Sequence, residues 1–462
     1  MLEFLWLHLL LVAGGLLGGL GLLLLIRDPR RRTHTLKWAI VIILAPYIGI
    51  PLYLMIGTRR ISKTIRAKGL IKLTTMEHPD HEVHGVGRSV GQLLRGMDMP
   101  RLTTGHQFKL LPDGITTYEA WINRIQQAQK TIEIETYVFK MDDTGRAIRD
   151  ALVEQAKAGV EVRVLIDSLG SHSTKKRFMQ PLVDAGGEVS WFIPVIHNPW
   201  KASGDTRNHR KIALFDRTHV IAGGSNIGEE YIGPVEVKDR WLDLNFELQG
   251  PAVQSYFDVF RSDWAFASGR KINTPPEPTT EAVGDSLAHV LPSGVDVPGD
   301  VLYNALVTAV YEARERLWIT TPYFVPDEPL TRALALAARR GIDLRIIIPD
   351  VSNQHLADLG RGSSVREIAE WGGRIIRYTG GMFHTKTVVA DDSWALVGSM
   401  NTDRRSLFLN FEVMLGVYRR EDVQAIAEWN ERLMSPCEEG ARPVTMRGRA
   451  WESMVRLLAP EL

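Results

Sequence analysis

Residues 209–226 read HRKIALFDRTHVIAGGSN, and residues 384–401 read HTKTVVADDSWALVGSMN. Both stretches begin with a histidine, carry a lysine two residues later and an aspartate five residues after that, and end in a glycine-containing turn with an asparagine. Successive side chains of a β-strand point to opposite faces, so each histidine and its lysine should project from the same face. A pattern of this length that occurs twice predicts a duplicated domain.

The similarity extends well beyond these two stretches. The tetrapeptide at 111–114, Leu-Pro-Asp-Gly, corresponds to Leu-Pro-Ser-Gly at 291–294. Each is followed by a helical pattern, a β-rich segment, a second helix that ends at a glycine, and a second strand. These elements are expected at 115–129, 132–139, Gly159 and 160–167 in the first copy, and at 300–315, 317–324, Gly341 and 342–349 in the second. Strand, helix and strand in this order predict two pseudo-symmetric α/β lobes, each a mixed sheet flanked by helices.

The lobes are expected to be flanked and joined by segments of other kinds. Residues 271–298 hold five prolines and few large apolar side chains, which is typical of a linker. The predicted division is a membrane hairpin with a basic flank at 1–72, a connector at 73–105, lobe 1 at 106–270, a linker at 271–288, lobe 2 at 289–440 and a C-terminal tail at 441–462.

Two uncharged runs near the N-terminus predict a membrane hairpin. Residues 4–26 carry no charge and would span about 35 Å as a helix, enough for a hydrocarbon core. Residues 38–57 form a second uncharged run that contains Pro46 and Pro51, so this segment either spans the membrane or re-enters from one side. The start of the chain lacks the positive charge and the cleavage site of a signal peptide.

The charge of the chain is unevenly distributed. The net charge is +1, but residues 1–72 hold eleven Lys and Arg and only two acids, which leaves the remaining 390 residues at −8. An acidic body argues against a nucleic-acid-binding protein, because phosphate backbones require a basic surface. Cys437 is the one cysteine, which excludes an internal disulfide and a cysteine-based metal site.

The paired motifs carry the groups that phosphoryl transfer requires. One imidazole can attack phosphorus while the other serves as general acid and base, and two ammonium groups stabilise charge on phosphoryl oxygens. Because lysines supply this charge, we expect no metal and no other cofactor. The repeated Leu-Asn-Phe-Glu at 244–247 and 409–412 makes Glu247 and Glu412 the groups expected to orient the rings. In this alignment lobe 1 carries a ten-residue insertion, since the Asn-to-Glu distance is 21 residues against 11.

Twelve residues are therefore candidates for the site. The catalytic set is His209, Lys211, Asp216, His384, Lys386 and Asp391, and the phosphate-contacting or orienting set is Ser225, Asn226, Glu247, Ser399, Asn401 and Glu412. Two alternatives remain open at this point. The two aspartates are equally suited to holding the local fold, and the two asparagines to forming turns.

The paired motifs resemble those of the phospholipase D superfamily, the HKD enzymes. The segments HRKIALFD (209–216), GGSNIGEEY (223–231) and RWLDLNFELQGPAV (240–253) are similar to those of bacterial cardiolipin synthases. The same is true of TTPYFVPDE (320–328) and of 383–413, and the N-terminal hairpin also resembles that family. The resemblance covers nearly the whole chain and implies phospholipase D-like lobes.

The resemblance also implies a reaction and a location. Two phosphatidylglycerol molecules would give cardiolipin and glycerol through a phosphatidyl-histidine, with His209 favoured as nucleophile and His384 as acid and base. The expected partners are phosphatidylglycerol and anionic membrane lipids, not nucleic acid, and a homo-oligomer is possible. The expected location is the bacterial inner membrane, which the chain crosses more than once, with the lobes on the cytoplasmic side.

Three other functions use the same features. A phospholipase D-type hydrolase, or a transferase to another alcohol, would need the same residues and differ only in the acceptor. A nuclease of the superfamily is disfavoured by the acidic body. A scaffold that has lost catalysis is disfavoured because both motifs are complete.

Overall fold

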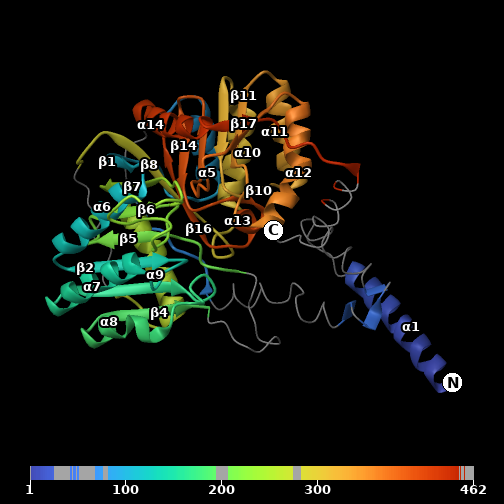
Figure 1. Cartoon of the computed structure of the whole chain (residues 1–462), viewed down its shortest axis with the longest axis horizontal. Coiled ribbons are helices and arrows are strands. Elements are labelled where there is room, and N and C mark those ends of the chain that lie inside the picture. The colour runs from blue at the N-terminus through green and yellow to red at the C-terminus, as the bar shows by residue number, and fades with distance from the viewer. Residues whose placement is uncertain are drawn as a thin grey trace. The chain divides into compact units, whose positions relative to one another are not determined.

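The computed structural model describes residues 2–24, 42–43, 45–47, 49–50, 68–75, 82–193, 206–273, 282–446, 448 and 452. These residues fall into two units. One holds the described residues up to 50, and the other holds those from 68 onward. The second unit contains both repeats (Figure 1).

The larger unit is built on one mixed sheet of fifteen strands among the described residues. Its strand order is β17-β12-β11-β9-β13-β14-β16-β8-β1-β7-β6-β5-β2-β3-β4. In lobe 1 the strands are β1 (Thr103–Leu111), β2 (Thr131–Thr136), β3 (Glu161–Asp167), β4 (Glu188–Phe192), β5 (Ile212–Phe215), β6 (His219–Gly223) and β7 (Asn245–Gln249). In lobe 2 they are β8 (Ser286–Ser293), β9 (Arg316–Thr320), β11 (Asp343–Pro349), β12 (Arg374–Tyr378), β13 (Thr387–Ala390), β14 (Trp394–Gly398), β16 (Glu412–Val417) and β17 (Cys437–Glu439).

The strand order confirms the duplication. From the centre of the sheet outward, lobe 1 runs β1-β7-β6-β5-β2-β3-β4 and lobe 2 runs β8-β16-β14-β13-β9-β11-β12. In each lobe the two parallel strand pairs lie toward the outer edge and the antiparallel strands lie inside them. The innermost strands, β1 and β8, pair antiparallel and join the two halves. A separate parallel pair is formed by β10 (Phe324–Val325) and β15 (Thr402–Asp403).

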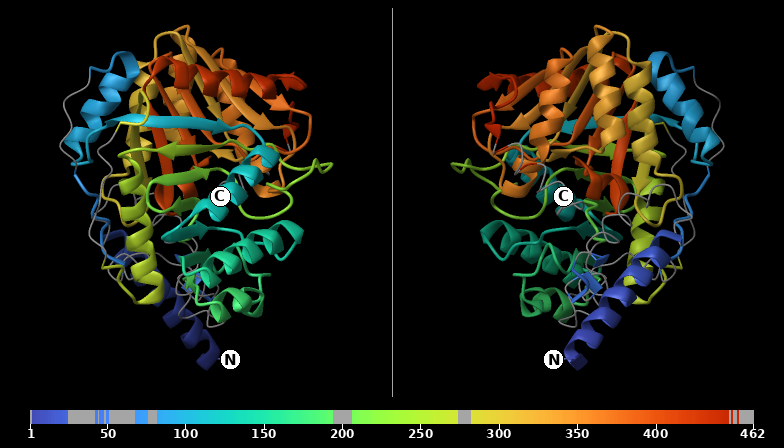
Figure 2. Two further views of the ribbon diagram at one scale, coloured as in Figure 1. Left: turned by 90° about the vertical axis from the view of Figure 1, so that its left-hand side faces the viewer. Right: turned by 90° about the vertical axis from the view of Figure 1, so that its right-hand side faces the viewer.

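Helices cover both faces of the sheet, as Figures 1 and 2 show. They are α5 (Gly85–Gly96), α6 (Gly114–Gln127), α7 (Asp143–Lys157), α8 (Gln180–Asp184), α9 (Val253–Ser268), α10 (Val301–Glu312), α11 (Glu328–Arg339), α12 (His355–Glu370), α13 (Arg404–Phe408) and α14 (Arg420–Glu431), with short 3-10 turns at Lys176–Met179 and Arg432–Met434. Asp113, Asp142 and Asp327 cap three of them by accepting backbone N–H bonds. Gly159 and Gly341 follow α7 and α11 with φ of 93° and 88°, as expected for C-terminal glycines.

The apolar core is shared between the lobes. One buried cluster combines side chains of both lobes, among them Phe246, Phe257, Trp318 and Phe411. Two further clusters lie within single lobes, one under α6 and α7 and the other under α10 and α11. Folding of either lobe alone would therefore expose apolar surface that the other lobe covers.

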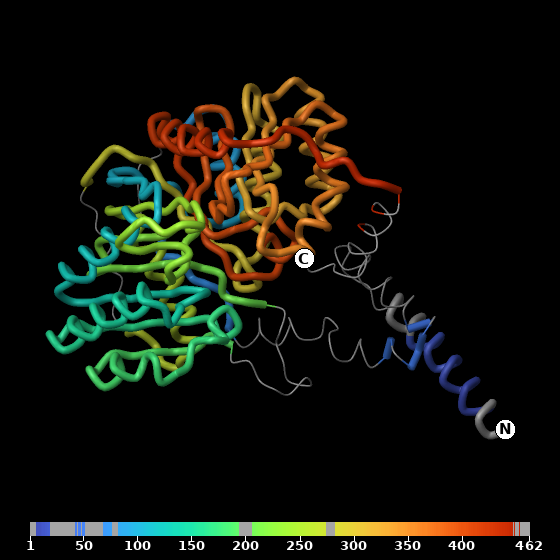
Figure 3. Tube along the Cα trace, in the orientation of Figure 1, coloured from blue at the N-terminus to red at the C-terminus, as the bar shows by residue number. Residues whose placement is uncertain are grey.

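The segment expected to be a connector contains a packed helix. Val86, Val90 and Leu94 are fully buried on one side of α5, because they recur at every fourth residue. They pack with residues of α10 in lobe 2, so the chain crosses to lobe 2 before it forms lobe 1 (Figures 2 and 3). The expected linker is also shorter than 271–288, since β8 begins at Ser286.

The N-terminal unit is partly described. Helix α1 (Leu2–Leu24) contains residues 4–24 of the first uncharged run. Two described residues of the second run contact it: the hydroxyl of Tyr47 lies 3.1 Å from His8 Nδ1, and Pro46 lies against Gly15. No helix among the described residues is long and apolar enough to cross a membrane. Most of the second run and of the basic flank lies outside the described residues, so the two membrane passes stay a prediction.

Asp216 and Asp391 hold the local fold. Each carboxylate accepts backbone N–H bonds from three successive residues, 129–131 for Asp216 and 314–316 for Asp391, at 2.7–3.2 Å. Both residues have φ near 50°, which aspartate tolerates better than most residues. Asp391 follows β13 while Lys386 precedes it, about 16 Å apart by strand rise. The expectation that these aspartates belong to the catalytic set is therefore wrong. Their carboxylates bind the backbone at the start of β2 and of β9.

A buried ionic cluster lies behind the first motif. The guanidinium of Arg210 donates to Asp263 (2.7 Å) and to Asp296 (3.1 Å), and its Nε donates to the carbonyl of Glu412 (3.1 Å). Lys68 pairs with the same two aspartates at 2.8 and 2.5 Å. All four side chains are fully buried. Two cations and two carboxylates thus balance each other, as burial of charge requires.

Replacing Asp391 with alanine is expected to lower stability and leave the chemistry intact. The change leaves three backbone N–H groups without their acceptor, which costs about 1–3 kcal/mol of the free energy of unfolding. Urea unfolding followed by circular dichroism measures this loss, and turnover per folded molecule should stay within a few-fold of wild type. The matched control is Asp392→Ala, which removes only a partly exposed pair with Arg420. A large loss of turnover in folded Asp391→Ala would contradict the structural role.

Candidate active site

The two His-x-Lys motifs meet between the lobes. His209 and Lys211 directly precede β5, and His384 and Lys386 directly precede β13. The imidazole centroids of His209 and His384 lie 6.5 Å apart at an interplanar angle of 71°. All four side chains are buried. The structure therefore confirms that the two motifs converge, as the repeat predicted.

The lysines fold back onto their own motifs. Lys211 Nζ donates to the carbonyl of His209 at 2.7 Å, and Lys386 Nζ donates to that of His384. Lys211 also lies over the ring of Tyr137, 5.6 Å from its centroid. Both ammonium groups lie near enough to the two imidazoles for their charges to act on them.

Each histidine is oriented by a carboxylate from the other lobe. His209 Nδ1 lies 3.0 Å from both carboxylate oxygens of Glu412, which belongs to lobe 2. His384 Nδ1 lies 3.1 Å from Asp243 Oδ2 and 3.0 Å from the carbonyl of Gly224, both in lobe 1. These contacts leave Nε2 of each ring as the nitrogen available to a substrate.

Backbone hydrogen bonds between the lobes place these two carboxylates. The N–H of His209 donates to the Phe411 carbonyl and that of Phe411 to the Arg207 carbonyl, both at 2.9 Å. The second motif repeats the arrangement, with His384 donating to Leu242 at 2.7 Å and Leu242 donating to Met382 at 3.1 Å. The residue after Phe411 is Glu412, and the residue after Leu242 is Asp243. Each carboxylate is therefore fixed by the strand segment that precedes it.

The structure corrects the orienting residue of lobe 1. Glu247 was expected to contact an imidazole, but its carboxylate pairs with Arg124 on α6. The group on His384 is Asp243, which was not among the twelve candidates. Gly223 pairs with Asn245 in lobe 1 and Gly398 pairs with Met414 in lobe 2, so Asp243 is the counterpart of Glu412. The repeated Leu-Asn-Phe-Glu is out of register by four residues, and the insertion in lobe 1 is six residues long instead of ten.

A sequence signal for Asp243 did exist. Both carboxylates lie between two apolar residues, as Leu-Asp-Leu at 242–244 and Phe-Glu-Val at 411–413. Aligning the strands that follow the two glycine turns would have matched these triplets. The identical tetrapeptide was the more conspicuous similarity and concealed them.

The serines and asparagines of the two motifs have different environments. Ser399 Oγ donates to Glu412 at 2.6 Å, whereas Ser225 Oγ accepts from Asn245 Nδ2 at 2.7 Å. Asn226 Oδ1 accepts the N–H of Val138 at 3.1 Å, which ties the motif to the end of β2. The amide oxygen of Asn401 is buried without a hydrogen bond among the described residues. Ser399 and Glu412 thus contact the His209 side of the site, while Ser225 and Asn226 support its walls.

Aromatic rings enclose both imidazoles. Tyr137 packs edge-on against His209 with centroids 5.1 Å apart. Tyr231 and Trp241 pack against His384 at 5.3 and 5.7 Å. These rings exclude water from the sides of the imidazoles and present apolar surface to a substrate.

Burial lowers the pKa values of the histidines and lysines in the site. It lowers the pKa of His384 to about 3 and that of His209 well below its usual range, and the lysine charges lower both further. Burial also lowers the pKa of Lys386 to about 7 and that of Lys211 to about 8. An arriving phosphate anion would offset the lysine charges and raise all four pKa values.

The two orienting carboxylates differ in acidity. Burial raises the pKa of Glu412 to about 7, against the opposing charge of Lys211 and the hydrogen bond of Ser399. Burial also acts to raise the pKa of Asp243, but the hydrogen bond from His384 and the charges of His384 and Lys386 bring it below its usual range. At neutral pH Asp243 is ionised, whereas Glu412 is close to its midpoint.

The arrangement can stabilise and transfer a phosphoryl group. Two imidazoles can lie on either side of a phosphorus atom, and two ammonium groups can neutralise its oxygens. Among the described residues, no group of three or more His, Cys, Asp or Glu side chains is arranged to hold a metal ion.

The chain matches known families over both lobes and the N-terminal region. Residues 121–264 and 306–434 match the family described as "Cardiolipin synthase, PLD-like domain", and residues 18–57 match "Phospholipase_D-nuclease N-terminal". In structure, the chain is similar to the phosphatidylserine synthase of Haemophilus influenzae, with a TM-score of 0.62, 15% identity, and 81% of this chain and 98% of that one covered. At this identity the likeness shows the phospholipase D-like fold alone.

Curated relatives align over almost the full length. Cardiolipin synthase 1 of Bacillus cereus is 30% identical, with 94% of this chain and 90% of that protein covered. The cardiolipin synthase of a Geobacillus species is 30% identical over 97% and 95% of the two chains, and cardiolipin synthase A of Pseudomonas putida is 31% identical over 93% and 91%. On these matches and on the paired motifs, the chain belongs to the cardiolipin synthase family of phospholipase D-like proteins.

Proposed function

We propose that the protein is a cardiolipin synthase that transfers a phosphatidyl group from one phosphatidylglycerol to another. The observation that carries this proposal is the pair of buried imidazoles 6.5 Å apart, each oriented by a carboxylate of the opposite lobe. The relatives named cardiolipin synthase support the choice of lipid. The reaction exchanges one phosphodiester for another, so it requires no external energy source.

In the first half of the reaction, Nε2 of His209 attacks the phosphorus of one phosphatidylglycerol. The new P–N bond forms as the P–O bond to the glycerol headgroup breaks. The bound phosphate anion raises the pKa of His384, so this ring enters the step protonated. It gives its Nε2 proton to the departing alkoxide, and glycerol leaves. Lys211 and Lys386 stabilise the charge that accumulates on the phosphoryl oxygens.

In the second half, a headgroup hydroxyl of another phosphatidylglycerol attacks the phosphatidyl-histidine. His384, now neutral, takes the proton of that hydroxyl as the new P–O bond forms. The P–N bond to His209 breaks, and cardiolipin is released. The two histidines return to their starting protonation states, which closes the cycle.

The difference between the orienting carboxylates supports this assignment of roles. An imidazole that must carry a full positive charge is best served by an ionised carboxylate, and Asp243 is ionised. Glu412, with its raised pKa, provides weaker support for an imidazolium at His209. His384 is therefore the better acid, and His209 the better neutral nucleophile.

We further propose that the protein is a multi-pass protein of the bacterial inner membrane with the lobes on the cytoplasmic side. The two uncharged runs at 4–26 and 38–57 support the anchoring, and the basic flank before residue 73 suits an anionic lipid surface. Phosphatidylglycerol would then reach the site from the membrane to which the protein is anchored.

The decisive experiment is product analysis with a single lipid. Detergent-purified protein incubated with phosphatidylglycerol and no nucleotide should release cardiolipin and glycerol in equal amounts. Lipid chromatography and an enzymatic glycerol assay measure the two products. Phosphatidic acid in place of cardiolipin would instead identify a hydrolase, because water would have taken the place of the second lipid.

A lipid with a good leaving group separates the roles of the histidines. Phosphatidyl-p-nitrophenol releases nitrophenolate without an acid, so His384→Ala should still form the adduct and give one burst of colour. Without the base for the second half, the phosphatidyl group should remain bound at His209 and be found there by peptide mass spectrometry. His209→Ala should give neither burst nor adduct. The reverse pattern would make His384 the nucleophile.

Asp243 is expected to act as a positioning residue for His384. Asp243→Asn should lower kcat by about 10²–10⁴-fold because the ring loses its tautomer preference and the stabilisation of its charged form. Steady-state kinetics and a pH profile measure the effect, and KM should change little. Glu247→Gln is the matched control, since its carboxylate contacts Arg124 and neither imidazole. Equal losses in the two variants would contradict the assignment.

A further inference from the structure

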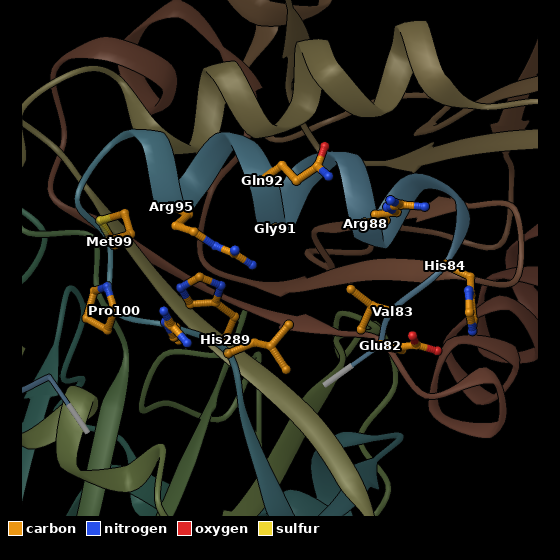
Figure 4. Close-up of a pocket in the computed structure, with 12 residues that line it drawn as sticks. Glu82, Val83, His84, Arg88, Gly91, Gln92, Arg95, Met99, Pro100 and His289 are labelled. Atoms are coloured by element: carbon orange, nitrogen blue, oxygen red, sulfur yellow. The ribbon is translucent and has the colours of Figure 1, made fainter. Parts of the chain in front are cut away.

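A cavity lies outside the histidine site, between α5 and β8. It has a volume of about 300 Å³, at the lower end of the usual range for small-molecule pockets. One wall is α5 and the segment that follows it, and the floor includes His289 of β8 (Figure 4). The cavity therefore arises where α5 packs against lobe 2.

The floor of the cavity carries a buried polar side chain. His289 is 4% exposed, and neither of its ring nitrogens makes a hydrogen bond of good geometry with the described residues. The Pro100 carbonyl lies near enough to raise the pKa of this ring slightly against the larger lowering by burial. A buried imidazole without a well-formed hydrogen bond is costly, and a ligand in the cavity would satisfy it.

The walls of the cavity are rich in arginine. Arg88 and Arg95 lie seven residues apart on α5, two turns or about 10.5 Å along the helix, and therefore on the same face. Arg95 projects from the helix toward the His289 ring in Figure 4. Arg101 contributes a third guanidinium from the segment after the helix, and Glu82 is the one acidic side chain of the lining. The lining thus carries three arginines against one acidic side chain, on a body that is acidic overall.

A glycine keeps the cavity open. Gly91 lies between the two arginines of α5 and lines the cavity, and a Cβ there would meet no atom within 4 Å. Its φ is compatible with any residue. Glycine in a helix interior lowers helix stability by about 1 kcal/mol relative to alanine, so the open space at Gly91 comes with a less stable helix.

The cavity is separate from the histidine site. His289 precedes Ser293 by four residues on β8, about 13 Å along the strand. Ser293 pairs with Glu412 in the sheet, whereas His289 pairs with Gly416. The cavity and the imidazoles therefore lie toward different ends of the same strands.

We propose that this cavity binds a phosphate group, carried by a lipid headgroup or by a small soluble molecule. The forked guanidinium groups of Arg88, Arg95 and Arg101 match phosphate oxygens, and His289 offers a further hydrogen bond from the floor. The charge, the volume and the buried imidazole all fit an anion of this size. The proposal does not depend on the reaction assigned to the histidine site.

The test compares two leucine substitutions in the same helix. Gly91→Leu fills the cavity, while Gly96→Leu places the same side chain in open space outside it. Isothermal titration of the full-length protein in detergent with inorganic phosphate measures the affinity. The histidine site is identical in all three proteins, so a difference between them reports the cavity. We expect Gly91→Leu to weaken binding about tenfold or more and Gly96→Leu to match wild type.

A second variant removes a charge from the cavity without filling it, so a packing defect in Gly91→Leu can be recognised. Arg88→Gln should also weaken the binding of inorganic phosphate, whereas Arg339→Gln, an exposed arginine on α11, should not. Near-ultraviolet circular dichroism shows whether each variant keeps its tertiary packing. If phosphate binds wild type, Gly91→Leu and Arg88→Gln equally, or none of them, the proposal is overturned.

Two probes distinguish the sources of the phosphate. Detergent micelles that contain phosphatidic acid present a phosphate on a lipid that lacks the glycerol leaving group, and micelles with phosphatidylcholine are the control. If phosphatidic acid displaces inorganic phosphate from wild type and binds Gly91→Leu more weakly than wild type, the cavity is a lipid headgroup site. Binding of inorganic phosphate that is lost in Gly91→Leu but is unaffected by either lipid identifies a site for a soluble phosphate compound.

Discussion

The site depends on backbone hydrogen bonds that join short segments of the two lobes. The strand segment before each His-x-Lys motif is paired with a short segment of the opposite lobe, at Phe411 and at Leu242. The next residue in each case is the carboxylate that orients the imidazole. Neither lobe therefore contains a complete half-site. The two lobes form one body, with a core cluster that both share.

Burial of so many charged groups requires compensation, and the structure provides it in two layers. Around the imidazoles, Asp243 and Glu412 partly offset the lysine charges. Behind the first motif, Arg210 and Lys68 are balanced by Asp263 and Asp296. Arg210 also holds the carbonyl of Glu412, so the second layer positions a member of the first. The residual positive charge of the lysines favours a phosphate anion, since its binding relieves their repulsion.

Much of the architecture could be read from the sequence because it follows local periodicity. The helices expected at 115–129 and 300–315 occur as α6 and α10, and the strands at 160–167 and 342–349 occur as β3 and β11. The convergence of His209 and His384 followed from a repeated pattern of matching spacing. Asp216 and Asp391 have the same spacing in both motifs for a different reason, since their carboxylates cap a loop. Spacing alone cannot separate chemistry from loop support, because both require a fixed position on the strand.

The sequence by itself determined the duplication, the strand and helix pattern, and the face on which histidine and lysine project, because these depend on neighbours within a few residues. Only the tertiary structure decided which carboxylate meets which imidazole. Those contacts join residues 141 and 203 positions apart in the chain, and a six-residue insertion shifts one of them relative to the repeat. Glu247 faces Arg124 because its place on β7 directs it to α6. The cavity under α5 likewise exists because this helix, although it precedes lobe 1 in the chain, packs on lobe 2.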